Sequence, residues 1–374
     1  MKIRLTAALG ISAALLLSAC AANEVTPTNE PANTAGSESA GTESSEAAAP
    51  SALSGTLTGI GASAQEVAQQ TWIAGFQTAN PDVTINYAPE GSGAGREAFI
   101  GGGADYAGSD RAFKVEELAE NSFGKCVADT KPINIPVYIS PIAVVFNVEG
   151  VDKLNMTPAT IAKIFKGDIT KWNDPAIAAD NEGVTLPDLA ITAVHRADTS
   201  GTTGNFTDYL QEVAPEVWDA EPSDDWAYPG GEAAEKTQGV VAAVAGGTGT
   251  IGYVDASQAG QFSTVAIGEA GKYNALTNEA AAAIVENSPV EEGRAENDMA
   301  IKIDRKAEGY PLVLVSYLIA CQDYQDDAVA ELVKAYGSYV VSAEGQAAAG
   351  ERAGNAPLSQ KVSDQAKAAI DSIQ

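Results

Sequence analysis

The sequence has little of what metal centres and nucleic-acid-binding surfaces need. Its 374 residues include one histidine and three cysteines, and none of these are paired at metal-ligand spacing. A zinc site requires several such ligands, so no metal centre is expected. Lysine and arginine number 22 against 50 aspartates and glutamates, a net charge of −28. Because nucleic acid is bound by basic surfaces, we expect no nucleic-acid partner.

Long hydrophobic runs are also scarce. One lies at the start, from Leu5 to Leu17 behind Lys2 and Arg4, and it is too short to cross a membrane comfortably. The following Ser18-Ala19-Cys20 completes a segment similar to the bacterial lipobox, in which the chain is cut before a cysteine that is then lipidated. We predict a lipoprotein signal peptide over residues 1–20 and an anchor at Cys20, which would hold the protein at the extracytoplasmic face of the bacterial cell membrane. An ordinary signal peptide with an incidental cysteine is the alternative.

Residues 21–52 contain no lysine or arginine and almost no large apolar side chain. Such a composition cannot bury enough surface to fold, so we predict a disordered tether. The rest of the chain is long for one core, and two lobes are expected.

The two remaining cysteines, Cys126 and Cys321, lie on either side of apolar, β-branched runs. Cys126 precedes the run 133–146, and Cys321 follows the run 312–319. If these runs are antiparallel strands, the cysteines meet and can form a disulfide, which an exported protein is free to make. Two buried free thiols are the alternative.

Apolar periodicity predicts an α/β fold. Strands are expected at 53–59, 83–87, 105–108, 190–194 and 249–254, and helices at 64–79, 160–165, 326–341 and 359–373. Strand, helix and strand in alternation indicate a parallel sheet, which binds ligands beyond the carboxyl ends of its strands. The runs 133–146 and 312–319 are the best candidates for strands that cross between lobes. We therefore predict a first lobe from 53–143 and 312–374, and a second lobe from 144–311.

Three segments share small residues, hydroxyls and free backbone N–H groups. They are Gly59–Ser63, Glu90–Gly95 and His195–Thr203, the last of which also contains Arg196. Such groups surround tetrahedral oxyanions, and a guanidinium matches two oxygens at once. Because the chain is strongly acidic, an anion site here must work through short hydrogen bonds and not through a long-range positive field.

Four segments together identify a family. They are Gly91–Gly95, Ala107–Asp110, Phe165–Pro175 and Arg196–Thr202. With these segments in the family's order, the sequence resembles the phosphate-binding proteins of bacterial ABC phosphate importers. The resemblance implies a two-lobe periplasmic-binding-protein fold (type II), with the ligand cleft between the lobes and two crossover strands at the hinge. It also implies a monomer that is not an enzyme, needs no cofactor, binds inorganic phosphate and delivers it to membrane permease subunits.

Carried over residue by residue, the resemblance gives the phosphate contacts. These are Ser63, Ala64, Ser92, Asp110, Arg196, Ser200, Gly201 and Thr202. Asp198 would hold the Arg196 guanidinium in place. Asp110 would accept a hydrogen bond from protonated phosphate, which sulfate cannot donate. The chain departs from the family at Ala64, where phenylalanine is usual, and at Thr199, where glycine is common.

Other functions fit single features of the sequence. Another oxyanion is the main alternative ligand. Residues 59–64 match a dinucleotide-binding pattern, and His195 is the one histidine that could serve an exported serine hydrolase, although no nucleophile-elbow motif accompanies it. Taken alone, Ser92 and Ser200 could be helix N-caps, Asp110 a turn residue, and Arg196 with Asp198 a surface ion pair. We predict that His195 is a packed neighbour of the site and not a catalyst.

Overall fold

A computed structural model describes residues 53–269 and 271–374. The predicted signal peptide, Cys20 and the predicted tether lie outside the described residues. Within them, no helix is long and apolar enough to cross a membrane.

The strands of the described part form one connected sheet system. In chain order they are β1 (Gly55–Gly61), β2 (Val83–Ala88), β3 (Tyr106–Ser109), β4 (Pro132–Asn147), β5 (Lys153–Met156), β6 (Thr192–Arg196), β7 (Glu232–Ala234), β8 (Thr250–Asp255), β9 (Ser263–Glu269), β10 (Lys272–Asn274) and β11 (Val313–Cys321).

The helices lie between and after these strands. They are α1 (Glu66–Ala79), α2 (Ser92–Ile100), α3 (Val115–Glu120), α4 (Pro158–Lys166), α5 (Pro175–Asp180), α6 (Gly201–Val213), α7 (Lys236–Gly246), α8 (Asn278–Asn287), α9 (Asp327–Val340), α10 (Ala343–Ala353) and α11 (Gln360–Asp371), with a short 3-10 turn at Ala256–Gln258.

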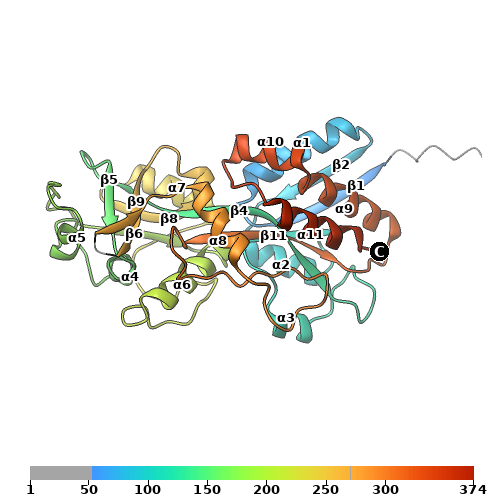
Figure 1. Cartoon of the computed structure of the whole chain (residues 1–374), viewed down its shortest axis with the longest axis horizontal. Coiled ribbons are helices and arrows are strands. Elements are labelled where there is room, and N and C mark those ends of the chain that lie inside the picture. Colours follow the sequence, from blue (N-terminus) through green and yellow to red (C-terminus); the bar gives the residue numbers. More distant parts are fainter. Residues whose placement is uncertain (1–52, 270) are drawn as a thin grey trace, which may run out of the picture. The chain divides into compact units, whose positions relative to one another are not determined.

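The sheet changes partners along β4. The neighbouring strands run in the order β2-β1-β3-β11-β4-β8-β6-β7. Up to Pro141, β4 pairs with β11, and from Ile142 onwards it pairs with β8 and β9. We call the part built on β1, β2, β3 and β11 the first lobe, and the part built on β5 to β10 the second lobe. Figure 1 shows β4 and β11 running between the two.

The crossing strands are antiparallel, which is the arrangement that the expected disulfide requires. Cys321 is paired in register with Pro132, and Cys126 bridges to Tyr324 just beyond β11. Cys126 and Cys321 form a disulfide, with Cα atoms 5.2 Å apart and a sequence separation of 195. The bond fastens the end of β11 to the segment before β4 without leaving the first lobe.

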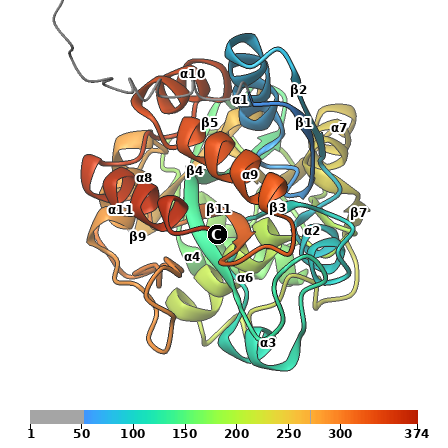
Figure 2. The same ribbon diagram turned by 90° about the vertical axis from the view of Figure 1, so that its right-hand side faces the viewer.

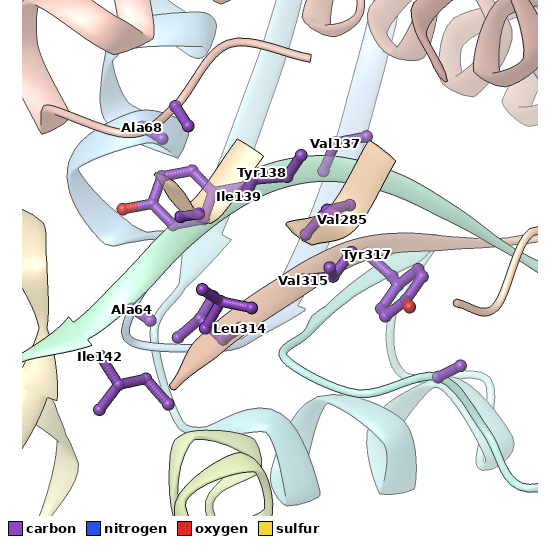
Figure 3. Close-up of a cluster of buried hydrophobic side chains, with 14 of the residues drawn as sticks. Ala64, Ala68, Val137, Tyr138, Ile139, Ile142, Val285, Leu314, Val315 and Tyr317 are labelled. Carbon is purple, nitrogen blue, oxygen red and sulfur yellow. The ribbon is translucent and has the colours of Figure 1, made fainter. Parts of the chain in front are cut away.

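Continuous apolar sequence explains why the crossing strands are buried. Every residue of β11 is buried, and so is all of β4 except its last residue. Strands covered on both faces have such unbroken apolar runs, because neither face alternates with solvent. Figure 3 shows Tyr138 and Ile142 of β4 beside Leu314 of β11, with Ala64 from the turn after β1 close by. The crossing strands therefore form a buried and largely apolar layer of the fold.

Helices of the first lobe cover its strands. Ala68, Trp72 and Phe76 recur every four residues on α1 and are all buried, as a helix with one core-facing side requires. Figure 2 shows α10 beside α1, and α9 beside α11. Helix α10 was not predicted. Its two glycines and its alanines carry no apolar periodicity. The helix is fixed instead by an N-cap from Ser342 and by a hydrogen bond of 2.9 Å from Trp72 Nε1 to the Gly345 carbonyl.

Candidate functional site

The predicted ligand residues lie where strands of both lobes end. Ser63 follows β1, Ser92 begins α2 after β2, and Asp110 follows β3. Arg196 is the last residue of β6, and Ser200 is the N-cap of α6. In open α/β sheets ligands bind at this carboxyl edge. Hydrogen bonds and a close approach between the lobes bring Ser92, Asp110, Gly201 and Thr202 together in one cluster.

Asp110 is the acceptor at the centre of the cluster. Its side chain is 2% exposed, its Oδ2 accepts a hydrogen bond from Thr202 Oγ1 at 2.9 Å, and its Oδ1 accepts one from Ser316 Oγ at 2.6 Å. Burial raises the pKa of Asp110, while the hydrogen bonds from Ser316 and Thr202 and the charge of Arg196 act in the opposite direction. Hydrogen-bond donors thus stabilise the charge of this buried carboxylate.

Three serine hydroxyls are arranged to donate. Ser92 Oγ accepts the N–H of Asp110 at 3.1 Å, and Ser63 Oγ accepts the N–H of Thr237 at 3.1 Å. Ser200 Oγ accepts the N–H of the third residue of α6 at 3.2 Å. A hydroxyl has one proton, so each oxygen that already accepts a backbone N–H keeps its proton for another group. For Ser63 the hydroxyl of Thr237, 3.0 Å away, is one such group.

Two glycines allow the lobes to approach at the cluster. A Cβ atom on Gly201 would lie 2.8 Å from both the Cβ of Asp110 and the Oγ of Ser92. Gly91 has φ of 100°, and a Cβ there would lie 2.6 Å from Asp198 Oδ2. Neither position accepts a larger residue without displacing a residue of the site.

Arg196 is buried and oriented by its neighbour. It is 3% exposed, and its Nε donates to Asp198 Oδ1 at 2.7 Å while its Nη2 pairs with Asp198 Oδ2. The backbone N–H of Lys236 donates to the same Oδ1 at 2.8 Å. Although burial acts to raise the pKa of Asp198, the Arg196 hydrogen bonds and charge lower it below its usual value. This pair is not the weak surface ion pair that Arg196 and Asp198 would form if they were exposed.

The two departures from the family pattern leave the cluster intact. Ala64 is fully buried in the turn before α1, where a small side chain faces the crossing strands. Asp129 and Lys236 are the described non-glycine residues with positive φ, so Thr199 does not occupy a conformation that favours glycine. The Thr199 carbonyl instead accepts the N–H of Gly93 at 3.1 Å, a bond between the lobes.

His195 is packed and not placed to act as a base on a serine. Its ring stacks on Trp226 with centroids 4.7 Å apart. Its two ring nitrogens lie 3.0 and 3.2 Å from the backbone carbonyl oxygens of Arg196 and Gly230. Among the described residues, no group of three or more His, Cys, Asp or Glu side chains could hold a metal ion.

The sequence reasoning missed several residues of the cluster. Thr237 at the start of α7 contacts Ser63, and Asp224 after α6 contacts Arg96 of α2. Neither lies in a recognisable motif. The sequence did give a sign of the role of Ser316. It is a polar residue inside the otherwise apolar run 312–319, and a buried polar group needs a hydrogen-bond partner.

Comparison with known proteins decides the family. Residues 46–344 match the model of the PBP superfamily domain. Phosphate-binding protein PstS3 of Mycobacterium bovis is 34% identical over 327 residues, which cover 85% of this chain and 86% of that one. The chain belongs to the PstS-type phosphate-binding proteins of the PBP superfamily.

Other members of this superfamily agree in sequence and fold. PstS 2 of Mycobacterium tuberculosis is 31% identical over 323 residues, covering 84% of this chain and 86% of that one. A phosphate-binding protein of Stenotrophomonas maltophilia, 19% identical, superposes with a TM-score of 0.67 over 84% of this chain and 93% of that one. The structure named PfluDING, bound with phosphate and 21% identical, gives 0.68 over the same shares. The two structures confirm the predicted two-lobe α/β fold.

Proposed function

We propose that this protein binds inorganic phosphate between its lobes and delivers it to the permease of an ABC importer. The contacts would be Ser63, Ala64, Ser92, Asp110, Arg196, Ser200, Gly201 and Thr202, with Asp198 supporting Arg196. The names of the relatives, whose alignments cover 84–85% of this chain and 86% of theirs, support the ligand class. They also support a binding protein and not an enzyme.

The buried Asp110 carboxylate is the observation that carries the proposal. Phosphate near neutral pH keeps at least one proton, which Asp110 can accept in a short O–H···O⁻ bond. Sulfate has no such proton, so it would bring a negative charge against a buried carboxylate with no hydrogen between them. Sites that require a ligand hydrogen bond reject analogues lacking it by about 10⁴ or more. Arsenate, which is also protonated, should bind.

Calorimetric titration of the purified protein with phosphate, arsenate and sulfate tests the proposal. We expect the first two to bind and sulfate to bind far more weakly, with no product formed. Arg196→Ala should weaken phosphate binding by about tenfold or more, because a charge-assisted hydrogen bond contributes about 1.5–3 kcal/mol. Equal affinity for sulfate and phosphate would mean that the natural ligand is another oxyanion or that the binding site lies elsewhere. Turnover of a phosphate ester would instead support the hydrolase alternative.

We further propose that a lipid on Cys20 holds the protein at the outer face of the cell membrane, near its permease. The support is the lipobox-like segment and the apolar run before it. Cys20→Ser should release the protein in soluble form. Fractionation of cells carrying this variant checks the anchor, and a variant that stays with the membrane would point to another attachment.

A further inference from the structure

A chain of buried polar side chains leads from the core of the first lobe to Asp110. Tyr336 of α9 donates its hydroxyl proton to Gln69 Oε1 at 2.8 Å, and Gln69 Nε2 donates to Gln65 Oε1 at 2.8 Å. Gln65 Nε2 donates to Ser316 Oγ at 2.6 Å, and Ser316 Oγ donates to Asp110 Oδ1 at 2.6 Å. The two glutamines and Ser316 are fully buried.

The direction of each bond is fixed by its neighbours. Gln65 Nε2 also donates to the backbone carbonyl of Tyr317 at 3.1 Å, and a carbonyl can only accept. The amide therefore cannot be flipped, and one of its N–H groups points at Ser316 Oγ. Since Ser316 already accepts from Gln65, its single proton goes to Asp110. The chain ends in a donor aimed at Oδ1, so this oxygen is held as an acceptor.

We propose that Gln65 and Ser316 determine ligand specificity by holding Asp110 ionised. The ligand must then supply the proton for a hydrogen bond to the other carboxylate oxygen of Asp110, Oδ2. This inference depends on the proposed phosphate function. It extends the set of functional residues to a helix N-terminus and a crossing strand that do not belong to the proposed phosphate contacts. Bonds aligned in one direction polarise each other in a low-dielectric interior, which strengthens the last of them.

Other groups around Asp110 do not provide this control by themselves. Arg196 from β6 favours its charge, whereas Asp224 from the loop after α6 opposes it, as does burial. Asp255 at the end of β8 and Tyr87 of β2 also interact with it electrostatically. Thr202 donates to Oδ2, the oxygen left for the ligand. Ser316 therefore donates to Oδ1, an oxygen that none of the proposed phosphate contacts reaches with a side-chain hydrogen bond.

Loss of the Ser316 proton should make Asp110 easier to protonate. A protonated Asp110 can donate to an anion, and sulfate then becomes acceptable. Sulfate carries no proton near neutral pH, so the pH dependence of its binding reports on the protein alone. It is for this reason a better probe than phosphate, which itself titrates.

The test is titration of the full chain with sodium sulfate and sodium phosphate from about pH 5 to about pH 8. For Ser316→Ala we expect the phosphate-to-sulfate affinity ratio to fall by about tenfold or more, and sulfate binding to appear at higher pH than in the unmodified protein. Ser316→Thr keeps the hydroxyl, so its affinity ratio and its pH dependence of sulfate binding should match those of the unmodified protein. Ser140→Ala is the matched control, because Ser140 is buried on the neighbouring strand β4 and its Oγ contacts the Pro141 carbonyl at 3.2 Å instead of Asp110.

The outcomes separate this inference from the proposed function. If the unmodified protein binds no phosphate, the function fails. If it prefers phosphate and a folded Ser316→Ala variant keeps the same ratio and the same pH profile, the inference alone is wrong. Gln65→Met, which removes the amide donor, should act in the same direction as Ser316→Ala. If neither variant folds, carbon-13 NMR of the Asp110 carboxyl in the unmodified protein decides, and a protonated carboxyl at about pH 7 would overturn the proposal.

Discussion

The Oδ2 atom of Asp224 lies 2.5 Å from Nη2 of Arg96, although the two residues belong to different lobes. The same oxygen is 2.8 Å from Nε of Arg111, so one carboxylate of the second lobe is held by two guanidiniums of the first. Arg96 and Asp224 are both buried, and Arg96 also donates to Ser109. A cavity of about 660 Å³ beside these residues is lined from both lobes and reaches Asp110.

This relationship predicts a residue that controls ligand retention without touching the ligand. Asp224→Ala leaves the buried Arg96 without a carboxylate partner when the lobes are together, a state that is strongly disfavoured for a buried charge, whereas Arg111 keeps its pair with Glu117. If the lobes separate as the site empties, phosphate affinity should fall by about tenfold or more, mainly through faster release. Stopped-flow binding measures this. Asp188→Ala removes an exposed pair with Lys171 and should change nothing; equal release rates for both variants would contradict the prediction.

Asp110→Asn tests the acceptor directly. Asparagine keeps the shape and one acceptor oxygen but offers an N–H₂ donor in place of the charge. We expect the preference for phosphate over sulfate to fall by roughly 10²–10⁴, largely because sulfate binds better. Competition between the two anions, followed by calorimetry, measures the ratio. Unchanged preference in the variant would mean that another residue excludes sulfate.

A second buried carboxylate, Asp255, should make stability depend on pH. Burial raises its pKa to about 6 from 3.8, although hydrogen bonds from the Ser257 backbone N–H and the Tyr138 hydroxyl oppose the rise. Because the folded pKa is the higher one, the folded state binds the extra proton. The resulting stabilisation is complete below about pH 4 and is lost as pH rises through about 6. Above that value the ionised side chain lowers the free energy of unfolding by about 3 kcal/mol.

Asp255→Asn removes this titration. Its amide can reach Ser257 Oγ, which is buried without a partner, as is Asp255 Oδ2. We expect urea unfolding at several pH values between about 4 and 7 to show that the free energy of unfolding of the variant increases relative to that of the unmodified protein as pH rises. Parallel pH profiles for the two proteins would show that Asp255 does not titrate in this window.

The disulfide should contribute to stability and not to binding. Replacing both Cys126 and Cys321 by alanine opens a loop of 195 residues, for which the chain-entropy model gives about 5 kcal/mol. Urea unfolding should show most of this loss, while phosphate affinity stays within about twofold because neither cysteine contacts the site residues. Thiol titration of unfolded, unreduced protein lacking Cys20 is the check, and two free thiols would rule the bond out.

The features that could be predicted from the sequence are those that depend on residues close together in the chain. The apolar runs at β4 and β11 and the glycine and hydroxyl segments after strands each reflect a backbone or burial requirement that nearby residues carry. The antiparallel pairing of β4 and β11 was only the condition under which the two cysteines would meet, and the structure shows that it holds. Helix α10 could not be predicted in this way, since its position depends on packing against α1.

The missed residues of the site depend on contacts between distant segments. Gln65 and Ser316 are separated by 251 positions, and Ser63 and Thr237 by 174. No spacing rule connects such pairs. Asp224 follows a helix in a polar loop and resembles many surface aspartates until the two arginines of the other lobe are placed around it. Only the lone serine in the apolar run of β11 gave a local sign of its role.

The position of the disulfide has a consequence for a cut chain. The covalent loop from Cys126 to Cys321 contains the second lobe, including Arg196 and the start of α6. A protease that cleaves one exposed turn within this loop would therefore leave both fragments covalently joined. The nicked protein would run as one species until reduced, and the two halves of the site would stay within reach of each other.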